Sequence, residues 1–483
     1  MENILKGLKP ELVFKHFEEI SQIPRGSGNE KAISDFLLKF GKDLGFESIQ
    51  DEHLNIIIKK PATKGYENCP GVILQGHMDM VCEKNKDTVH DFEKDPIKLR
   101  VDGDMIYATG TTLGGDNGIA VAMGMAVVSS NDVEHPAIEL LFTTDEEVGM
   151  TGAMKLNGKN LSGKYIINLD SEEEGYILVS CAGGVTTFNK VPVEYEKVCS
   201  EKQGLLVEIK GLKGGHSGMD IIKQRANSNR LLGRLLNLLD IDYDLAKVEG
   251  GSKNNAIPRE ADALITVSKS DVENTKKKIS EIESIFKHEF STSDPDISIN
   301  CSETTVEKVF TCDSKDRVIK LINLMPNGIQ TMSMDIEGLV ESSTNLGVLK
   351  TIDNEVICEC AVRSSVETLR TDITNKMKLL ACALGGAYES EDPYPAWEYR
   401  KGSKLEQICV DAYKKLTGKD PVIMAIHAGL ECGLLLEHLP DAEAISIGPN
   451  MADVHTPNEH LSISSTENTW NYLLAILKSM NQL

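Results

Sequence analysis

Short apolar runs that alternate with helical stretches place the strongest constraint on the fold. The runs GVILQ (71–75), IELLFTT (138–144) and KYIINL (164–169) are continuous and apolar, as expected for strands buried on both faces. An apolar helix is predicted at 118–130, and the alternation returns near residue 395 with a further strand at 443–448. This pattern predicts an α/β fold with a largely parallel central sheet.

The middle of the chain has a different pattern. Stretches such as GLLVEIKG (204–211), ADALITVS (261–268) and EVICECAVRSS (355–365) alternate between apolar and polar residues. This alternation is typical of half-exposed strands in a two-layer α+β module. We therefore predict a domain at 187–392, inserted into a domain built from 1–186 and 393–483.

The predicted insertion contains a faint internal repeat. The segment 250–270 aligns with 341–365, because each has a turn with Ser and Asn, then a spacer, then an alternating strand. The alignment suggests two tandem copies of one α+β unit. Chance similarity is the alternative explanation.

Charge and cysteine content limit the partners and the compartment. The net charge is -23, with 74 acidic and 51 basic residues, which disfavours nucleic acids and anionic membranes as partners. The N-terminal residues lack the features of a signal peptide, and no apolar run approaches the roughly 20 residues of a membrane helix. The 11 cysteines show no framework spacing, so we expect reduced thiols in a cytoplasm.

Metal-competent side chains follow four of the apolar runs. In parallel α/β sheets, ligands bind outside the carboxyl ends of the strands, so these side chains are expected to meet at one edge. Taken alone, each motif also fits a polar turn or a solvated loop, and their joint placement favours a metal site. The residues are His77 and Asp79 in GHMDM, Glu146 and Glu147 in TTDEEVG, Asp170 in NLDSE, and His455 in MADVHTP.

Asp116, in the glycine-rich loop GTTLGGDNGIA, adds a further carboxylate at the start of the apolar helix. From that position it could bridge two cations. The predicted ligand set is imidazole and carboxylate with no obvious thiolate. It fits two zinc ions, or manganese or cobalt in their place.

Five motifs of the chain resemble a known enzyme family. GHMDMVCEK, GTTLGGDNGIA, TTDEEVGMTGA, GGHSGMDI and IHAGLECG are similar to segments of the two-zinc metallopeptidases. That family includes carboxypeptidase G, peptidase T, carnosinase and the bacterial aminoacyl-histidine dipeptidases. The resemblance spans nearly the whole chain, and it implies a zinc-peptidase catalytic domain with an inserted α+β lid domain.

The resemblance also implies a role for each residue of the predicted centre. Asp79 would orient a ligand histidine, and Glu146 would act as the general base on a zinc-bridging hydroxide. Asp116 would bridge the two metals, and the peptide bond that follows it is expected to be cis. The implied ligands of the two zinc ions are His77, Asp116, Glu147, Asp170 and His455.

Four further residues are candidate substrate contacts by the same resemblance. His216 in GGHSG would stabilise the oxyanion of the substrate carbonyl. Asn255, or its neighbour Asn254, and Arg363 would hold the substrate carboxylate. Glu431 would contact the substrate amine.

The implied activity is hydrolysis of unblocked dipeptides, of the Xaa-His type and broader. Members of the family that act next to a free amino terminus tend to carry aspartate at the position of Asp170. An N-acyl-amino-acid amidohydrolase and a non-catalytic metal-binding relative are the alternatives, and the intact Asp79 and Glu146 argue against the second. Lids of relatives pair between subunits, so a homodimer is expected, although a doubled lid leaves a monomer open.

Overall fold

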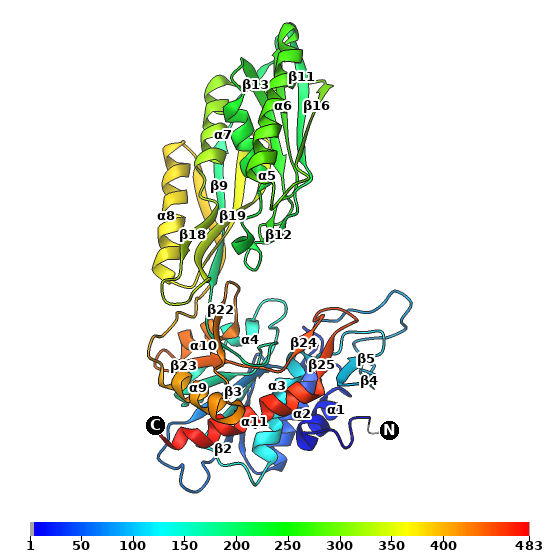
Figure 1. Ribbon diagram of the computed structural model, residues 1–483, viewed down its shortest axis with the longest axis vertical. Helices are drawn as coiled ribbons and strands as arrows, with labels where there is room; N and C mark the ends of the chain where they lie inside the picture. The colour runs from blue at the N-terminus through cyan, green and yellow to red at the C-terminus, as the bar shows by residue number, and fades with distance from the viewer. Residues whose placement is uncertain (1–3, 483) are drawn as a thin grey trace. The chain divides into compact units, whose positions relative to one another are not determined.

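The computed structural model describes residues 4–482, which form two compact units (Figure 1). Unit 1 comprises Met1–Ser180, Trp397–Ala425 and Leu430–Leu483, and unit 2 comprises Cys181–Ala396 and Ile426–Gly429. The domain boundaries at 187 and 392 stay a prediction. Every helix within residues 4–482 falls short of the length and apolar character that a membrane crossing requires.

An eight-stranded sheet lies at the centre of unit 1. Across the sheet the strands are β1 (Glu47–Gln50), β2 (Ile56–Lys60), β6 (Ile138–Thr143), β3 (Val72–His77), β7 (Tyr165–Asn168), β23 (Glu443–Ser446), β8 (Tyr176–Cys181) and β22 (Val422–Ile426). Strands β6, β3, β7 and β23 are parallel, as the apolar runs predicted.

The predicted α/β fold is confirmed, but the central sheet as a whole is mixed and not largely parallel. Strands β1 and β2 form an antiparallel pair, β2 is antiparallel to β6, and β8 is antiparallel to β23. Continuous apolar runs favour parallel strands, because such strands are buried on both faces, but they do not fix the direction of each strand. Direction depends on the connections, and the short link between β1 and β2 permits only a hairpin.

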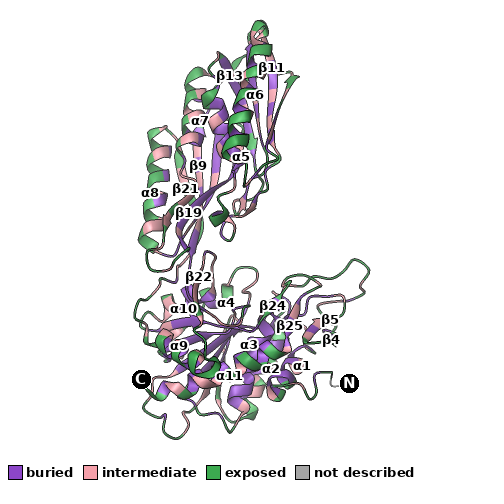
Figure 2. Cartoon of the chain, viewed as in Figure 1, coloured by how far each residue is buried: buried purple, intermediate pink, exposed green. Residues whose placement is uncertain are grey.

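The buried helix α3 (Gly115–Ser129) packs on β3 and β6 and brings the glycine-rich loop to the sheet. Nearly all of its residues are buried, which explains its apolar sequence (Figure 2). The other helices of unit 1 are α1 (Glu11–Ile20), α2 (Lys31–Asp43), α4 (Thr151–Met154), α9 (Lys404–Thr417), α10 (Glu431–His438) and α11 (Ile463–Ser479). A small sheet joins β4 (Leu99–Asp102), β5 (Met105–Ala108), β24 (Met451–Ala452) and β25 (His460–Ser462).

Unit 2 contains one large sheet made of two halves with the same topology. The first half is β11 (Lys202–Lys210), α5 (Ser228–Leu238), β13 (Tyr243–Gly250), β15 (Ala261–Ser268), α6 (Val272–Glu289) and β16 (Ser298–Thr304). The second half is β9 (Gly183–Pro192), α7 (Cys312–Leu324), β19 (Val340–Ile352), β20 (Glu355–Ser364), α8 (Glu367–Ala383) and β21 (Ala387–Tyr394). Each half is a βαββαβ unit, with its strands in the spatial order fourth, first, third, second.

This shared topology supports the repeat hypothesis, but the two copies are nested and not in tandem. The first half lies between β9 and α7 of the second half. A ribbon of β10 (Tyr195–Lys197) and β17 (Lys308–Phe310) joins the chain where it enters and leaves the nested copy. The aligned segments end in β15 and β20, which are the third strands of their halves. A sequence alignment compares segments pairwise and does not reveal that one copy interrupts another.

The two halves share a core and meet at a narrow seam. Contacts run from α6 to α5, from α5 to α7 and from α7 to α8, so these helices form one layer over the sheet. At the seam, β13 pairs with β19 through Gly250 and Leu349. The remaining short strands of unit 2 are β12 (Gly215–His216), β14 (Ala256–Ile257) and β18 (Gly328–Met332).

The chain is closely packed around Gly347, next to this seam. A Cβ atom at Gly347 would lie 2.5 Å from both Cα and the carbonyl oxygen of Asn254. These are backbone atoms, which can move only if the strands around them shift. We therefore expect Gly347→Ala to lower the free energy of unfolding by about 1–3 kcal/mol. Denaturant unfolding measures this change. Unchanged stability would show that the seam tolerates a side chain.

Candidate metal centre

The predicted metal-competent residues lie at the carboxyl ends of adjacent strands of unit 1. His77 is the last residue of β3, while Glu146 and Glu147 follow β6. Asp170 follows β7, and His455 lies in the chain that continues from β23. Since these four strands are neighbours and parallel, their ends face the same edge of the sheet.

Asp116 is shared between two clusters of ligand atoms. One carboxylate oxygen, Oδ1, lies 3.1 Å from His77 Nε2, and the other, Oδ2, lies 3.2 Å from His455 Nε2. On the first side, Asp170 Oδ1 is 3.5 Å from His77 Nε2. On the second side, Glu147 Oε2 is 2.9 Å from His455 Nε2. The structure therefore brings all five predicted ligands together, with one carboxylate between two imidazoles.

The donor set and its spacing fit a pair of divalent cations. A tetrahedral zinc ion with bonds of about 2.0–2.1 Å separates its ligand atoms by roughly 3.3 Å, close to the spacing between these groups. Glu147 Oε1 is also buried without a hydrogen-bond partner among the described residues, which leaves a ligand atom free. The three groupings in residues 4–482 that could hold a metal ion all come from this one cluster.

Asp79 supports the centre without facing the shared carboxylate. It is completely buried, and its Oδ1 lies 3.4 Å from His77 Nδ1. Its two oxygens accept hydrogen bonds from the backbone N–H groups of Glu146 (3.1 Å) and Glu147 (3.3 Å), and from Ser27 Oγ (2.8 Å). One carboxylate thus contacts the His77 imidazole and binds the backbone of the acidic pair, as expected for a residue that orients a predicted ligand.

The electrostatics of the cluster favour bound cations. Burial raises the pKa of Glu146 to about 9, and Asp170, Glu431 and Glu147 add to the shift although His77 opposes it. Hydrogen bonds to Asp116 and Glu147 raise the pKa of His455 to about 10. Cations here would displace the proton of His455, because metal ligands must be deprotonated, and their positive charge would lower the pKa of Glu146.

Three of the four predicted substrate contacts belong to unit 2. His216 Nδ1 accepts hydrogen bonds from the backbone N–H groups of Gly218 (3.3 Å) and Met219 (3.1 Å). This leaves Nε2–H as a donor. The short pair of β12 and β14 places His216 opposite Ala256, next to Asn255. Their contact with a substrate stays a prediction.

Arg363 lies in the same part of unit 2 as His216. Its Nη1 donates to the Tyr394 hydroxyl at 2.7 Å, while its Nε is buried without a partner among the described residues. Burial and the nearby guanidinium lower the pKa of His216. The same causes lower the pKa of His427 to about 3, and its Nε2 lies 2.7 Å from Ser343 Oγ. Arg363 therefore faces neutral imidazoles and has hydrogen-bonding capacity left for an anion.

The fourth contact, Glu431, lies at the start of α10 in unit 1. Its carboxylate accepts hydrogen bonds from Gln75 Nε2 (2.5 Å) and Thr143 Oγ1 (2.7 Å), and its Oε1 has no partner among the described residues. Burial, with a contribution from Asp170, raises the pKa of Glu431 to about 7. Its predicted contact with a substrate amine stays a prediction.

Sequence analysis missed residues that hold the centre in place. Arg25 and Ser27 lie in the segment PRGSG, whose proline and glycines are typical of a break between helices and do not indicate a functional site. Glu459 accepts hydrogen bonds from the loop that carries Asp116. Its position four residues after His455 is a weak signal, because an acidic residue near a loop is commonly solvated.

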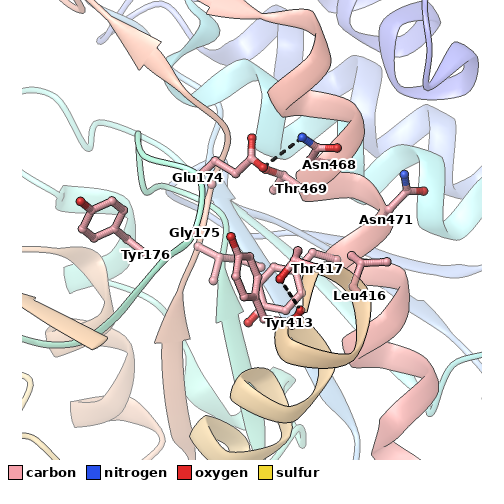
Figure 3. A pocket seen from close by; sticks show the side chains of 12 residues that line it. Glu174, Gly175, Tyr176, Tyr413, Leu416, Thr417, Asn468, Thr469 and Asn471 are labelled. Atoms are coloured by element: carbon pink, nitrogen blue, oxygen red, sulfur yellow. Dashed lines mark hydrogen bonds between the residues drawn. The ribbon is translucent and has the colours of Figure 1, made fainter. Parts of the chain in front are cut away.

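Unit 1 also has a cavity that shares no lining residue with this cluster. It has a volume of about 230 Å³ and is lined mainly by α9, α11 and the start of β8 (Figure 3). Glu174 accepts a hydrogen bond from Asn468 at its rim (3.0 Å). None of the predicted metal ligands or substrate contacts lines it, so the carboxylate and imidazole cluster is the better candidate for a catalytic centre.

Comparison with known proteins agrees with this geometry. The model of peptidase family M20/M25/M40 matches residues 73–479, which include the whole cluster. The chain belongs to this family. A crystal structure of aminoacylhistidine dipeptidase from Vibrio alginolyticus superimposes with a TM-score of 0.95 and 37% identity, covering 98% of this chain and 97% of that one.

Other members of the family extend the comparison. The cytosol non-specific dipeptidase of Escherichia coli (strain K12) is 37% identical over 479 residues, which is 99% of each protein. The aminopeptidase PepT of Bacillus cereus is 16% identical with a TM-score of 0.56, covering 98% of this chain and 99% of that one. At that identity the likeness shows the fold alone. The peptide bond between Asp116 and Asn117 is cis, as the resemblance implied.

Asp116 is the residue whose loss should most affect metal binding. Because its two oxygens lie 3.1 Å and 3.2 Å from the two imidazoles, we expect Asp116→Ala to lower the zinc content per chain from two to one or fewer. Elemental analysis of the chelated and zinc-restored protein measures this content. Asp102→Ala, at an exposed carboxylate of the same unit, is the control and should bind as much zinc as the wild type. Full occupancy in Asp116→Ala would remove this residue from the ligand set.

Proposed function

We propose that this protein is a metal-dependent dipeptidase that hydrolyses the peptide bond of unblocked dipeptides. The observation that carries the proposal is the placement of Asp116 between His77 and His455, with further carboxylates on both sides. Membership of the peptidase family and two relatives named as dipeptidases support it. The proposed ligands are His77, Asp116, Glu147, Asp170 and His455.

Two divalent cations, zinc or in its place manganese or cobalt, would polarise the scissile carbonyl and lower the pKa of a water molecule there. The donor set suits these metals, because it combines imidazole with carboxylate. Asp79 keeps the Nε2 atom of His77 directed at the shared carboxylate through its contact with Nδ1.

Glu146 is the proposed general base. Its carboxylate lies 4.0 Å from His77 Nε2, at the edge of the cluster, and no side chain in residues 4–482 donates a hydrogen bond to it. It is therefore free to accept a proton from the attacking water and to deliver it to the leaving amine. The hydrogen bond from its backbone N–H to Asp79 fixes its position.

Four residues stay proposed substrate contacts. In unit 2, His216 would donate an N–H group to the developing oxyanion, and Arg363 with Asn255 would hold the substrate carboxylate. Glu431 offers a buried carboxylate oxygen to the substrate amine. We propose the segments 1–186 and 393–483 as the catalytic domain and 187–392 as its lid.

The proposed cellular location rests on the name of one relative. The relative from Escherichia coli is named as a cytosolic enzyme, which supports a cytoplasmic location and small peptides as substrates. The homodimer implied by the resemblance stays a prediction, as does the expectation that the protein binds neither nucleic acid nor membranes.

The role of Glu146 is tested by an isosteric change. Glu146→Gln removes the proton acceptor but keeps the shape, so kcat should fall by about 10²–10⁴-fold while zinc content is unchanged. Steady-state assays with an unblocked dipeptide and elemental analysis measure the two quantities. Glu52→Gln, at an exposed glutamate of the same unit, serves as the control. Near wild-type turnover in Glu146→Gln would exclude it as the base.

The proposed substrate class is tested by comparing free and blocked amines. A site that binds the substrate amine rejects analogues that cannot make this contact, so kcat/KM for an Xaa-His dipeptide should exceed that for its N-acetyl form by at least about 100-fold. Both substrates are assayed with the zinc-restored protein. A preference for the N-acetyl form would favour an N-acyl-amino-acid amidohydrolase instead.

A further inference from the structure

Glu459 binds the loop that carries Asp116 with both of its carboxylate oxygens. Oε2 accepts hydrogen bonds from the backbone N–H groups of Leu113 (2.8 Å) and Gly114 (3.1 Å). Oε1 accepts from those of Gly115 (2.8 Å) and Asp116 (3.3 Å). Four successive N–H groups thus converge on one carboxylate, which is 2% exposed.

The shape of the loop explains this convergence. Gly114 adopts the left-handed conformation, with a φ of 68°, just before α3 begins at Gly115. Successive N–H groups in such a turn point to the same side and form a concave anion site. Asp116 and Asn117 are non-helical, so the N–H groups of residues 113–116 precede the regular part of α3 and have no partners inside it. Glu459 supplies these partners from a distant part of the chain.

The same residue connects the loops of two predicted ligands. Glu459 lies four residues after His455, and its own N–H donates to the carbonyl of Thr456 at 3.0 Å. On its other side, the strand β25 begins at His460. The distance of 3.2 Å between His455 Nε2 and Asp116 Oδ2 therefore spans two loops that Glu459 ties together.

Arg25 lies near Glu459 and extends the connection to a third loop. Its guanidinium, also 2% exposed, donates to the carbonyl of Gly114 and to those of Met78 (3.1 Å) and Asp79 (3.2 Å). Glu459 is among the acidic groups near this guanidinium. The loops after β3, before α3 and before β25 are thus held by two buried side chains, Arg25 and Glu459.

We propose that Glu459 is a positioning residue for the metal centre, which fixes the glycine-rich loop so that the two oxygens of Asp116 face the two imidazoles. This inference rests on the proposed function, because it takes Asp116 as the ligand shared by two cations. The carboxylate of Glu459 is suited to this role, because its two oxygens accept hydrogen bonds from all four N–H groups.

Glu139 offers a matched control for a purely structural role. It is a buried glutamate, 4% exposed, and its carboxylate accepts hydrogen bonds from the backbone N–H groups of Ser162 (2.9 Å) and Gly163 (2.9 Å). It lies near the amino end of β6, at the edge of the parallel strands opposite the metal centre. Loss of Glu139 should therefore lower stability and leave metal binding unchanged.

The test measures zinc affinity of the chelated full-length protein by competition with a chromophoric chelator. We expect Glu459→Ala to weaken zinc binding by about 10- to 100-fold, the usual effect of losing a group that orients a ligand. Added formate should fill the space left by the side chain and restore affinity in Glu459→Ala but not change it in the wild type. Glu459→Gln keeps one acceptor oxygen and should give an intermediate affinity, and Glu139→Ala should give that of the wild type.

The outcomes separate this inference from the proposed function. Wild-type zinc affinity in Glu459→Ala, or in Glu459→Gln if the alanine variant does not fold, would overturn the positioning role. A loss that formate leaves unrepaired, or an equal loss in Glu139→Ala, would also overturn it. Undiminished zinc content in Asp116→Ala would instead contradict the proposed function, because the shared ligand would then be wrongly assigned.

Discussion

The arrangement of unit 1 depends on where the carboxylate of Asp116 is held. Its two oxygens lie 3.1 Å and 3.2 Å from two imidazoles that come from residues far apart in the sequence. A carboxylate in that position would repel the other acidic groups unless cations or protons lay between them. Burial and nearby carboxylates raise the pKa of Glu146, and hydrogen bonds to two carboxylates raise that of His455, so the crowding of acidic groups contributes to both shifts. A pair of divalent cations is the simplest way to relieve it.

The fold meets this constraint with three kinds of support. Parallel strands bring His77, the acidic pair and Asp170 to one edge of the sheet. Asp79 contacts the imidazole of His77 and accepts hydrogen bonds from the backbone of the acidic pair. Glu459 and Arg25 hold the loops on either side of the shared carboxylate. Each supporting group is buried and hydrogen-bonded, so the loops of the predicted ligands are held in place, as precise metal binding requires.

Unit 2 has a different architecture, because it is built from two copies of one topology. Each βαββαβ half leaves an edge strand, and the two edges pair at the seam of β13 and β19. Pairing covers edges that would otherwise be exposed to other chains. The group of His216, Arg363 and His427 within this unit keeps its imidazoles neutral and its guanidinium incompletely bonded. Such a group suits a carboxylate ligand.

The sequence by itself determined the buried strands, the apolar helix and the candidate ligands. Each of these follows from a short stretch of residues, because continuous apolar runs indicate burial on both faces and each side chain has its own chemistry. Strand direction, the nesting of the repeat and the roles of Arg25 and Glu459 were decided only by the tertiary structure. Glu459 is separated from the N–H groups that it binds by 343–346 residues. No local pattern specifies such a contact, since it exists only when the packing of the sheet and α3 brings the two loops together.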